Sequence, residues 1–86
     1  MKTPLSIVPA FGAQLRAARG LAGWSSRELA EKSGVSVPTI QRIESGKGSQ
    51  NIQQRTIADL IDTFMSIGIE FTGTPENGAG VRFKPK

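Results

Sequence analysis

Three side chains common in catalysis and metal binding are missing from this 86-residue sequence, which contains no cysteine, no histidine and no tyrosine. Without cysteine the chain can form neither disulfides nor thiolate metal sites. Without histidine it lacks the usual general base and the commonest metal ligand. Carboxylates, lysines and serines remain, but most of the familiar catalytic groups are absent. We therefore expect a protein that is not an enzyme and that uses no cofactor and no metal.

Long apolar runs are also missing. No stretch approaches the ~20 apolar residues that a helix needs to cross a bilayer. The first nine residues hold two prolines and one charged side chain in place of a secretory apolar core. We therefore expect a cytoplasmic protein without a membrane partner. Its length fits one domain with a small core.

The charge of the chain is basic and unevenly distributed. The net charge is +4, and the isoelectric point lies near 10.1. Residues 1–55 hold eight cations against three anions, a net of +5, whereas residues 56–86 hold three cations against four anions, a net of −1. The basic excess favours an anionic partner for the first two thirds of the chain.

Apolar periodicity predicts one helix before the centre of the chain and one after it. Apolar residues at helical spacing from Phe11 to Ala22 predict a helix over about residues 9–22, preceded by an N-terminal arm of residues 1–8. A polar loop at residues 47–51 leads to another apolar periodic segment, which we expect to be a helix that ends at Gly68.

Between these helices, capping signals predict two shorter ones. Ser25 and Glu28 have the spacing of a capping box, so a helix begins at residue 26, and Gly34 ends it. Ser36 is a good N-cap, and Pro38 is tolerated in the first turn that follows. Two helices of about eight residues joined by a three-residue turn form a helix-turn-helix unit over residues 26–45.

The last third of the chain changes period. Residues 69–72 and 81–84 alternate apolar and polar side chains, which predicts two strands. Asn77–Gly78 is a dipeptide favoured in tight hairpin turns. We expect a C-terminal β-hairpin over residues 69–86, with its register left open.

From residue 15 to about residue 67 the sequence resembles the Cro-like, Xre-type helix-turn-helix family of phage repressors and bacterial regulators. The segments that carry the resemblance are LRAAR at 15–19, WSSRELA at 24–30, SGVS at 33–36 and TIQRIESGK at 39–47. It departs from many relatives at Ser26, where they have Gln, and at Val37 and Pro38, where they often have polar residues.

The resemblance implies a fold and a function. The fold is mainly α, a four- to five-helix repressor-like bundle with a central helix-turn-helix in residues 1–68, followed by the hairpin as a dimerisation extension. The expected function is sequence-specific binding of double-stranded DNA. The protein would be a transcription regulator, a repressor, encoded by a bacterium or a phage.

In this fold the second helix of the unit lies in the major groove. With Ile40 and Ile43 turned inward, the expected base-reading residues are Val37, Pro38, Thr39, Gln41 and Arg42. Arginine suits guanine, glutamine suits adenine, and apolar side chains suit the thymine methyl group. A phosphate or solvent contact for Arg42, and plain packing for Val37, remain open alternatives.

Phosphate contacts are expected at two polar clusters and at the cap of the second helix. The residues are Ser25, Ser26, Arg27, Ser36, Lys47, Ser49, Gln50 and Asn51. Free amides and the helix dipole at a helix start favour an anion. The resemblance also implies a structural ion pair between Arg19 and Glu44, whose disruption can cost ~3–5 kcal/mol when buried.

The apolar residues of the tail must cover something, because an isolated hairpin is marginal in water. They cover either the fourth helix of the same chain or a partner chain. Since such proteins bind palindromic operators as dimers, we expect a homodimer through Phe64, Ile67, Ile69, Phe71, Val81 and Phe83.

Two alternatives keep the same fold. One is an antitoxin, in which the hairpin binds a toxin. The other is a protein-interaction module that has lost DNA binding, against which the basic N-terminal two thirds argue. An enzyme is the remotest alternative, because it would need paired carboxylates in a cleft.

Overall fold

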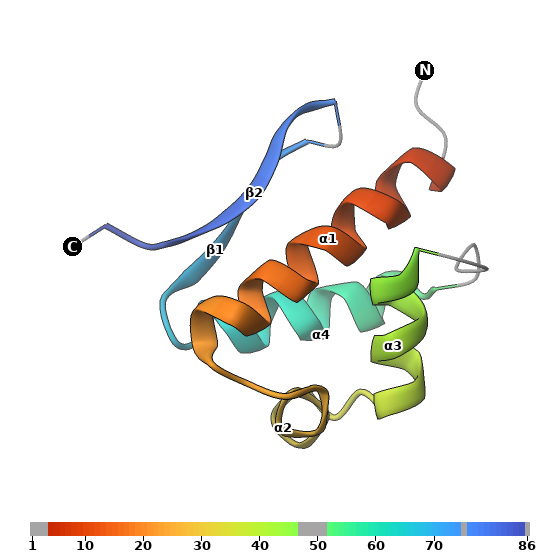
Figure 1. The fold of residues 1–86 in the computed structure, drawn as a ribbon, viewed down its shortest axis with the longest axis vertical. Helices are drawn as coiled ribbons and strands as arrows, with labels where there is room; N and C mark the ends of the chain where they lie inside the picture. The colour runs from red at the N-terminus through yellow and green to blue at the C-terminus, as the bar shows by residue number, and fades with distance from the viewer. Residues whose placement is uncertain (1–3, 47–51, 75, 86) are drawn as a thin grey trace.

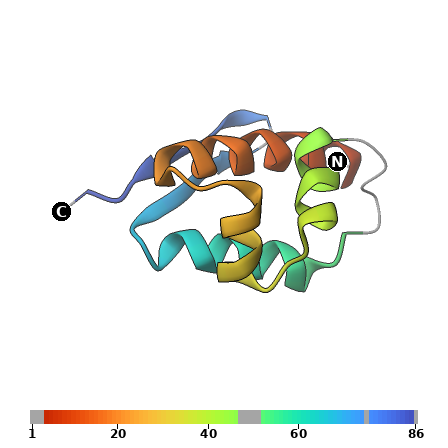
Figure 2. The same cartoon turned by 60° about the horizontal axis from the view of Figure 1, so that its bottom comes forward.

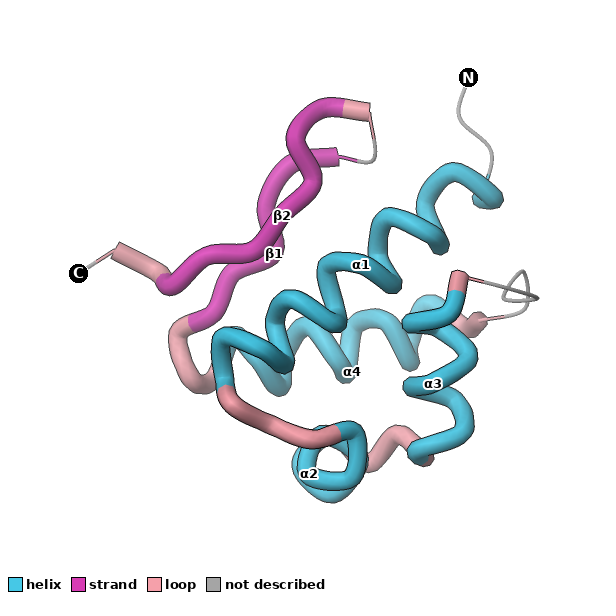
Figure 3. Tube along the Cα trace, viewed as in Figure 1, coloured by secondary structure: helices cyan, strands magenta, loops and turns pink. Residues whose placement is uncertain are grey.

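The computed structural model describes residues 4–46, 52–74 and 76–85. Within them it contains four helices and one two-stranded antiparallel sheet, which confirms the mainly α fold with a C-terminal hairpin (Figures 1 and 3). The elements are α1 (Pro4–Ala22), α2 (Ser26–Ser33), α3 (Val37–Ser45), α4 (Gln54–Met65), β1 (Ile69–Thr74) and β2 (Asn77–Phe83).

The first helix begins earlier than the sequence predicts. α1 starts at Pro4 instead of residue 9, so residues 4–8 of the expected arm are helical, and residues 1–3 lie outside the described residues. The prediction rests on the apolar spacing that begins at Phe11 and leaves both prolines outside or at the start of the helix. Proline has a φ near the helical value and suits the first helical position, while Pro9 in the second turn removes one backbone hydrogen bond without forbidding the helix.

α2 and α3 have the predicted bounds because their ends are fixed locally. Gly34 and Gly46 follow the two helices with φ of 78° and 70°, a left-handed conformation that few other residues adopt without strain. Ser25 and Ser36 cap the two N-termini with their side-chain oxygens. Only residues 34–36 separate the helices, so α3 is held at a fixed angle to α2.

The hairpin turns before the predicted dipeptide. Thr74 pairs with both Asn77 and Gly78, which places Asn77–Gly78 inside β2 at an irregularity of the ladder, and not at the centre of the turn. Gly78 uses its positive φ of 75° in this bulge. A Cβ on Gly73 of the opposite strand would collide with the backbone of Gly78, so the two strands cross here more closely than other residues allow.

The hairpin packs on the helices of its own chain. Ile69 is fully buried in the core with residues of all four helices, and Phe71 and Val81 pack against that core. The Phe71 ring lies 5.6 Å from that of Phe11 and 5.9 Å from that of Phe64, centroid to centroid. In this structure the hairpin therefore covers α1 and α4 of its own chain.

One polar contact fastens the hairpin to α1. The side-chain amide of Gln14 donates to the carbonyl oxygens of Thr72 (3.1 Å) and Gly80 (2.9 Å), which face each other across the two strands. One side chain thus satisfies an acceptor on each strand, and both strands are tied to the same helix.

Two of the six residues expected in a dimer interface are fully buried in the single chain. Phe64 and Ile69 have no exposed surface in the single chain, so a partner could reach them only by opening the core. Phe71 and Val81 are half-buried against the helices. Ile67 and Phe83 alone of the six are exposed, with 45% and 58% of their surface accessible.

None of the helices within the described ranges combines the length and the hydropathy that a membrane span requires.

Candidate nucleic-acid interface

α3 has one face that belongs to the core and one that faces solvent. Ile40 and Ile43 are fully buried against the other helices. Pro38, Gln41 and Arg42 are exposed on the opposite side. The helix therefore presents a short row formed by one apolar ring, one amide and one guanidinium.

The remaining two residues expected to read bases are half-buried at the start of α3. Val37 and Thr39 both have intermediate exposure. Ser36 accepts a hydrogen bond from the Thr39 backbone amide (3.3 Å) and donates its hydroxyl to Thr39 Oγ1 (2.9 Å). Because Ser36 Oγ is the helix cap, its first role is to start the helix, and Thr39 keeps its own hydroxyl hydrogen for an outside acceptor.

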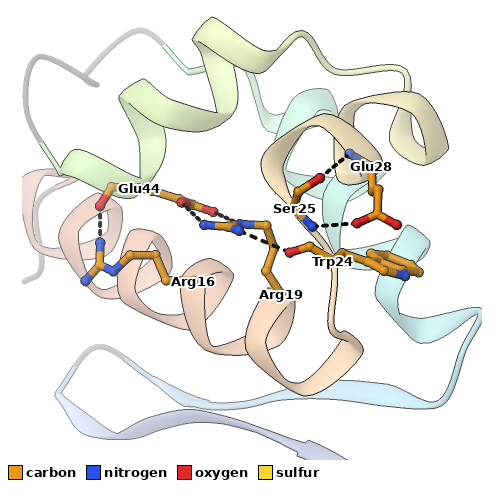
Figure 4. Close-up of polar contacts among 6 residues, drawn as sticks. All are labelled: Arg16, Arg19, Trp24, Ser25, Glu28 and Glu44. Carbon is orange, nitrogen blue, oxygen red and sulfur yellow. Dashed lines mark hydrogen bonds and ion pairs between the residues drawn. The ribbon is translucent and has the colours of Figure 1, made fainter.

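Arg19 of α1 and Glu44 of α3 lie together as the resemblance implies (Figure 4). Arg19 donates to the Glu44 carboxylate from Nε (2.7 Å) and Nη2 (2.8 Å), and its Nη1 donates to the Trp24 carbonyl (3.1 Å). The Glu44 side chain is only 8% exposed. The two bonds to Glu44 tie α1 to α3, and the bond to Trp24 ties both to the α1–α2 link.

Arg19 stays charged over the whole neutral range. The hydrogen bond to Glu44 and the attraction of its carboxylate raise the pKa of Arg19 above its ordinary value, against the opposing effect of burial. A cation with a raised folded-state pKa contributes stability at every pH below its unfolded pKa, and that contribution disappears only as the pH rises through the folded pKa. For an arginine this window lies far above neutral pH.

A second arginine on α1, which the sequence analysis did not single out, holds the same end of α3. Arg16 donates from Nη1 to the Glu44 main-chain carbonyl near the C-terminus of α3, where a cation also complements the helix dipole (Figure 4). Arg16 precedes Arg19 by three residues, so the two lie on one face of a helix. The three-residue spacing between Arg16 and Arg19 is the feature of the sequence that could have identified Arg16.

Polar groups at the start of α2 form hydrogen bonds with each other. Ser25 Oγ accepts from the Glu28 amide (3.0 Å), and the Ser25 amide donates to Glu28 Oε1 (2.9 Å), as Figure 4 shows. This reciprocal capping leaves the hydroxyl hydrogen of Ser25 available for an acceptor outside the helix. Arg27 is exposed and Ser26 half-buried, and both lie in the first helical turn, where backbone amides lack intrahelical partners.

The second cluster of expected phosphate contacts cannot be placed. Lys47, Ser49, Gln50 and Asn51 all lie outside the described residues. They follow Gly46, which ends α3, and precede Ile52, which leads into α4.

This arrangement defines a class of protein. Two short helices joined by three residues, with the second exposed along one side and buttressed by α1, form a helix-turn-helix domain (Figure 2). A protein-family model described as a helix-turn-helix domain matches residues 10–65, and the chain belongs to this family. The match runs from α1 to the end of α4 and stops before the hairpin. No curated protein and no solved structure matches the chain. Membership of the helix-turn-helix family indicates DNA as the partner of the chain.

Proposed function

We propose that this protein is a transcription regulator of the Cro-like, Xre-type kind, a repressor, which binds a palindromic operator as a homodimer and reads the major groove with α3. The observation that carries the proposal is the two-sided character of α3. Its inner face is locked into the core by Ile40 and Ile43, and its outer face offers Gln41 and Arg42 to solvent.

The outer face fits the chemistry of base edges. The Arg42 guanidinium can donate to both O6 and N7 of a guanine, and the Gln41 amide matches N6 and N7 of an adenine. Pro38 and the half-buried Val37 add apolar surface for thymine methyl groups. The Thr39 hydroxyl suits any neighbouring base or phosphate.

Contacts to phosphate fix the position of such a domain without reading sequence. Ser25, Ser26 and Arg27 at the start of α2 are candidates, together with the Ser36 cap and the segment of Lys47, Ser49, Gln50 and Asn51. The net charge of +5 over residues 1–55 supports this assignment, because phosphate neutralisation supplies most sequence-independent affinity. A dimer doubles these contacts and matches the two half-sites of a palindrome, about 34 Å apart. Occupying a promoter is sufficient for repression.

The test compares two arginines of equal charge. Operators are first selected from host genomic fragments, and binding is then titrated on the operator and on a scrambled duplex. Arg42→Ala is expected to weaken operator binding by about 1–3 kcal/mol and to relax selectivity at one base pair. Arg82→Ala is the matched control, because Arg82 is 58% exposed on β2 and pairs with Glu70 instead of lying on α3.

Two results would contradict the proposed role of Arg42. Equal losses on the two duplexes for Arg42→Ala, or equal effects of Arg42→Ala and Arg82→Ala, would remove the base-reading role. Lys47→Ala should instead weaken all duplexes alike and lower the slope of affinity against salt by about one.

A further inference from the structure

The large apolar side chains that the described residues leave exposed gather at one end of the molecule. They are Leu21, Met65, Ile67 and Phe83, with exposed fractions of 38%, 56%, 45% and 58%. They come from the last turn of α1, the last residue of α4, the turn after it and the last residue of β2. Figures 1 and 2 both show these ends of the four segments side by side. We call these four residues the end patch.

Hydrogen bonds connect three of these segments directly. The Gly68 amide donates to the Met65 carbonyl (3.0 Å), and the Lys84 amide donates to the Gly68 carbonyl (2.7 Å). The turn that carries Ile67 is thus held between the end of α4 and the end of β2. The patch is built on fixed backbone.

The position of Phe83 in the hairpin shows that the end patch adjoins the core. Residues directly opposite in an antiparallel pair project from the same face of a sheet. Phe83 pairs with the fully buried Ile69, and the next pair on that face, Phe71 with Val81, packs against the helices. Phe83 therefore stands in the core-facing row of the hairpin, at the point where the helices no longer cover it.

The size of the patch suits the centre of a protein interface. At about 200 Å² for a large side chain, the four exposed fractions amount to roughly 400 Å² of apolar surface. The largest apolar patch on a typical monomer has about this size and is often functional. A standard interface buries about 800 Å² on each partner, with an apolar centre and a polar rim. The patch supplies such a centre, and its polar surroundings supply the rim.

We propose that the end patch is the surface on which a second copy of this chain docks, an inference that rests on the proposed homodimer for the identity of the partner. A twofold interface sets the same patch against itself, so its rim must be self-complementary. Asp62, one turn before Met65 on α4, and Lys84, next to Phe83, are both exposed and of opposite charge. A twofold arrangement can place each cation beside the partner's anion.

Docking at this surface leaves the reading helix open. In Figures 1 and 2, α3 lies at the other side of the molecule from the ends of α1, α4 and β2 that form the patch. α1 runs between the two sites, so the same helix that carries Leu21 supports α3 through Arg16 and Arg19. Dimer formation and DNA contact therefore use separate surfaces.

The test measures self-association and DNA binding separately on the full chain. Sedimentation of the wild type should show a dimer, and the double variant Ile67→Ser, Phe83→Ser should raise the dimer dissociation constant by about tenfold or more. The helical circular dichroism of this variant should persist, because both side chains are largely exposed. Arg42→Ala is the reciprocal control, expected to bind the operator more weakly and less selectively and to dimerise like the wild type.

A cross-link gives a second measurement that does not depend on weakening the interface. The chain contains no cysteine, so a single introduced cysteine is the only thiol. Ile67→Cys should give a covalent dimer with a short thiol-reactive linker. Ala13→Cys, at an exposed position of α1 outside the patch, should give far less.

Three results would overturn the inference. The first is a patch variant that dimerises like the wild type, and the second is cross-linking at Ala13→Cys that equals or exceeds that at Ile67→Cys. The third is a wild type that stays monomeric both free and on the palindrome, which would assign the patch to a different protein. Selective operator binding that survives any of these results would leave the DNA-binding part of the proposed function intact.

Discussion

The two faces of α3 are made of different kinds of residue, and we expect one to serve folding and the other to serve binding. The inner face is apolar except for Glu44, whose charge is matched by Arg19 and whose main-chain carbonyl is bonded by Arg16. On the outer face, Gln41 and Arg42 extend into solvent. Substitutions on the inner face should therefore change folding, and substitutions on the outer face should change binding alone. Three predictions, ordered by their expected effect on stability, test this difference.

The largest effect is expected at the centre of the inner face. Ile43→Ala should lower the free energy of unfolding by about 2–5 kcal/mol, because it removes buried methyl groups and leaves a cavity. Ile43→Val should cost only about 0.5–1.5 kcal/mol. Urea unfolding followed by circular dichroism measures both. A loss at Ile43→Ala no larger than that at Ile43→Val would contradict the placement of this side chain in the core.

A smaller effect is expected where α1 touches α3. A Cβ on Gly12 would collide with the Ile43 carbonyl oxygen, whereas a Cβ on Gly20 of the same helix would meet no atom within 4 Å. Gly12→Ala should therefore destabilise by about 1–3 kcal/mol, since the two helices must move apart. Gly20→Ala should stabilise by about 0.5–1 kcal/mol, because alanine restricts the unfolded chain and favours the helix.

This pair of glycines sharpens the comparison, because the same substitution in one helix should have opposite signs. Thermal unfolding of the two variants under identical conditions gives the answer. Equal shifts in the same direction would show that the close approach of α1 and α3 does not limit the packing of the inner face.

The sequence predicted the helix-turn-helix unit well because its signals are local. The capping box at Ser25, the left-handed glycine at position 34 and the cap at Ser36 each act within a few residues, and together they give the bounds of α2 and α3. The spacing of Ile40 and Ile43, which are both buried, indicates which side of α3 faces outward. The orientation of the candidate site was therefore predictable.

Features that depend on distant contacts were harder to predict. The predicted start of α1 is too late, because the apolar periodicity begins only at Phe11, whereas the helix begins at Pro4, a residue that the first helical position accepts. The turn of the hairpin was misplaced, because Asn77–Gly78 serves equally well in a bulge. Phe64 was assigned to a dimer surface because apolar character alone does not distinguish a core position from an interface position.

Two side chains that hold α1 to other elements of the fold had no clear role in the sequence. Gln14 bonds carbonyls that lie 58 and 66 residues further along the chain, and no local pattern predicts such partners. Arg16 could have been recognised from its spacing to Arg19, but its acceptor is a main-chain carbonyl of α3, which carries no residue signature.

The smallest effect on stability is expected on the outer face. Gln41→Ala removes an exposed amide that packs against no core residue, so the free energy of unfolding should change by no more than about 0.5 kcal/mol. The replacement of its neighbour on the buried side, Ile40→Ala, should lower the free energy of unfolding by about 2–5 kcal/mol.

If Gln41 reads an adenine, its replacement should also weaken operator binding by about 1–3 kcal/mol and leave binding to scrambled DNA unchanged. Parallel unfolding curves and titrations on the two duplexes measure these effects. A Gln41→Ala variant that loses stability as Ile40→Ala does would mean that both sides of α3 belong to the core, and the division between a folding face and a binding face would have to be given up.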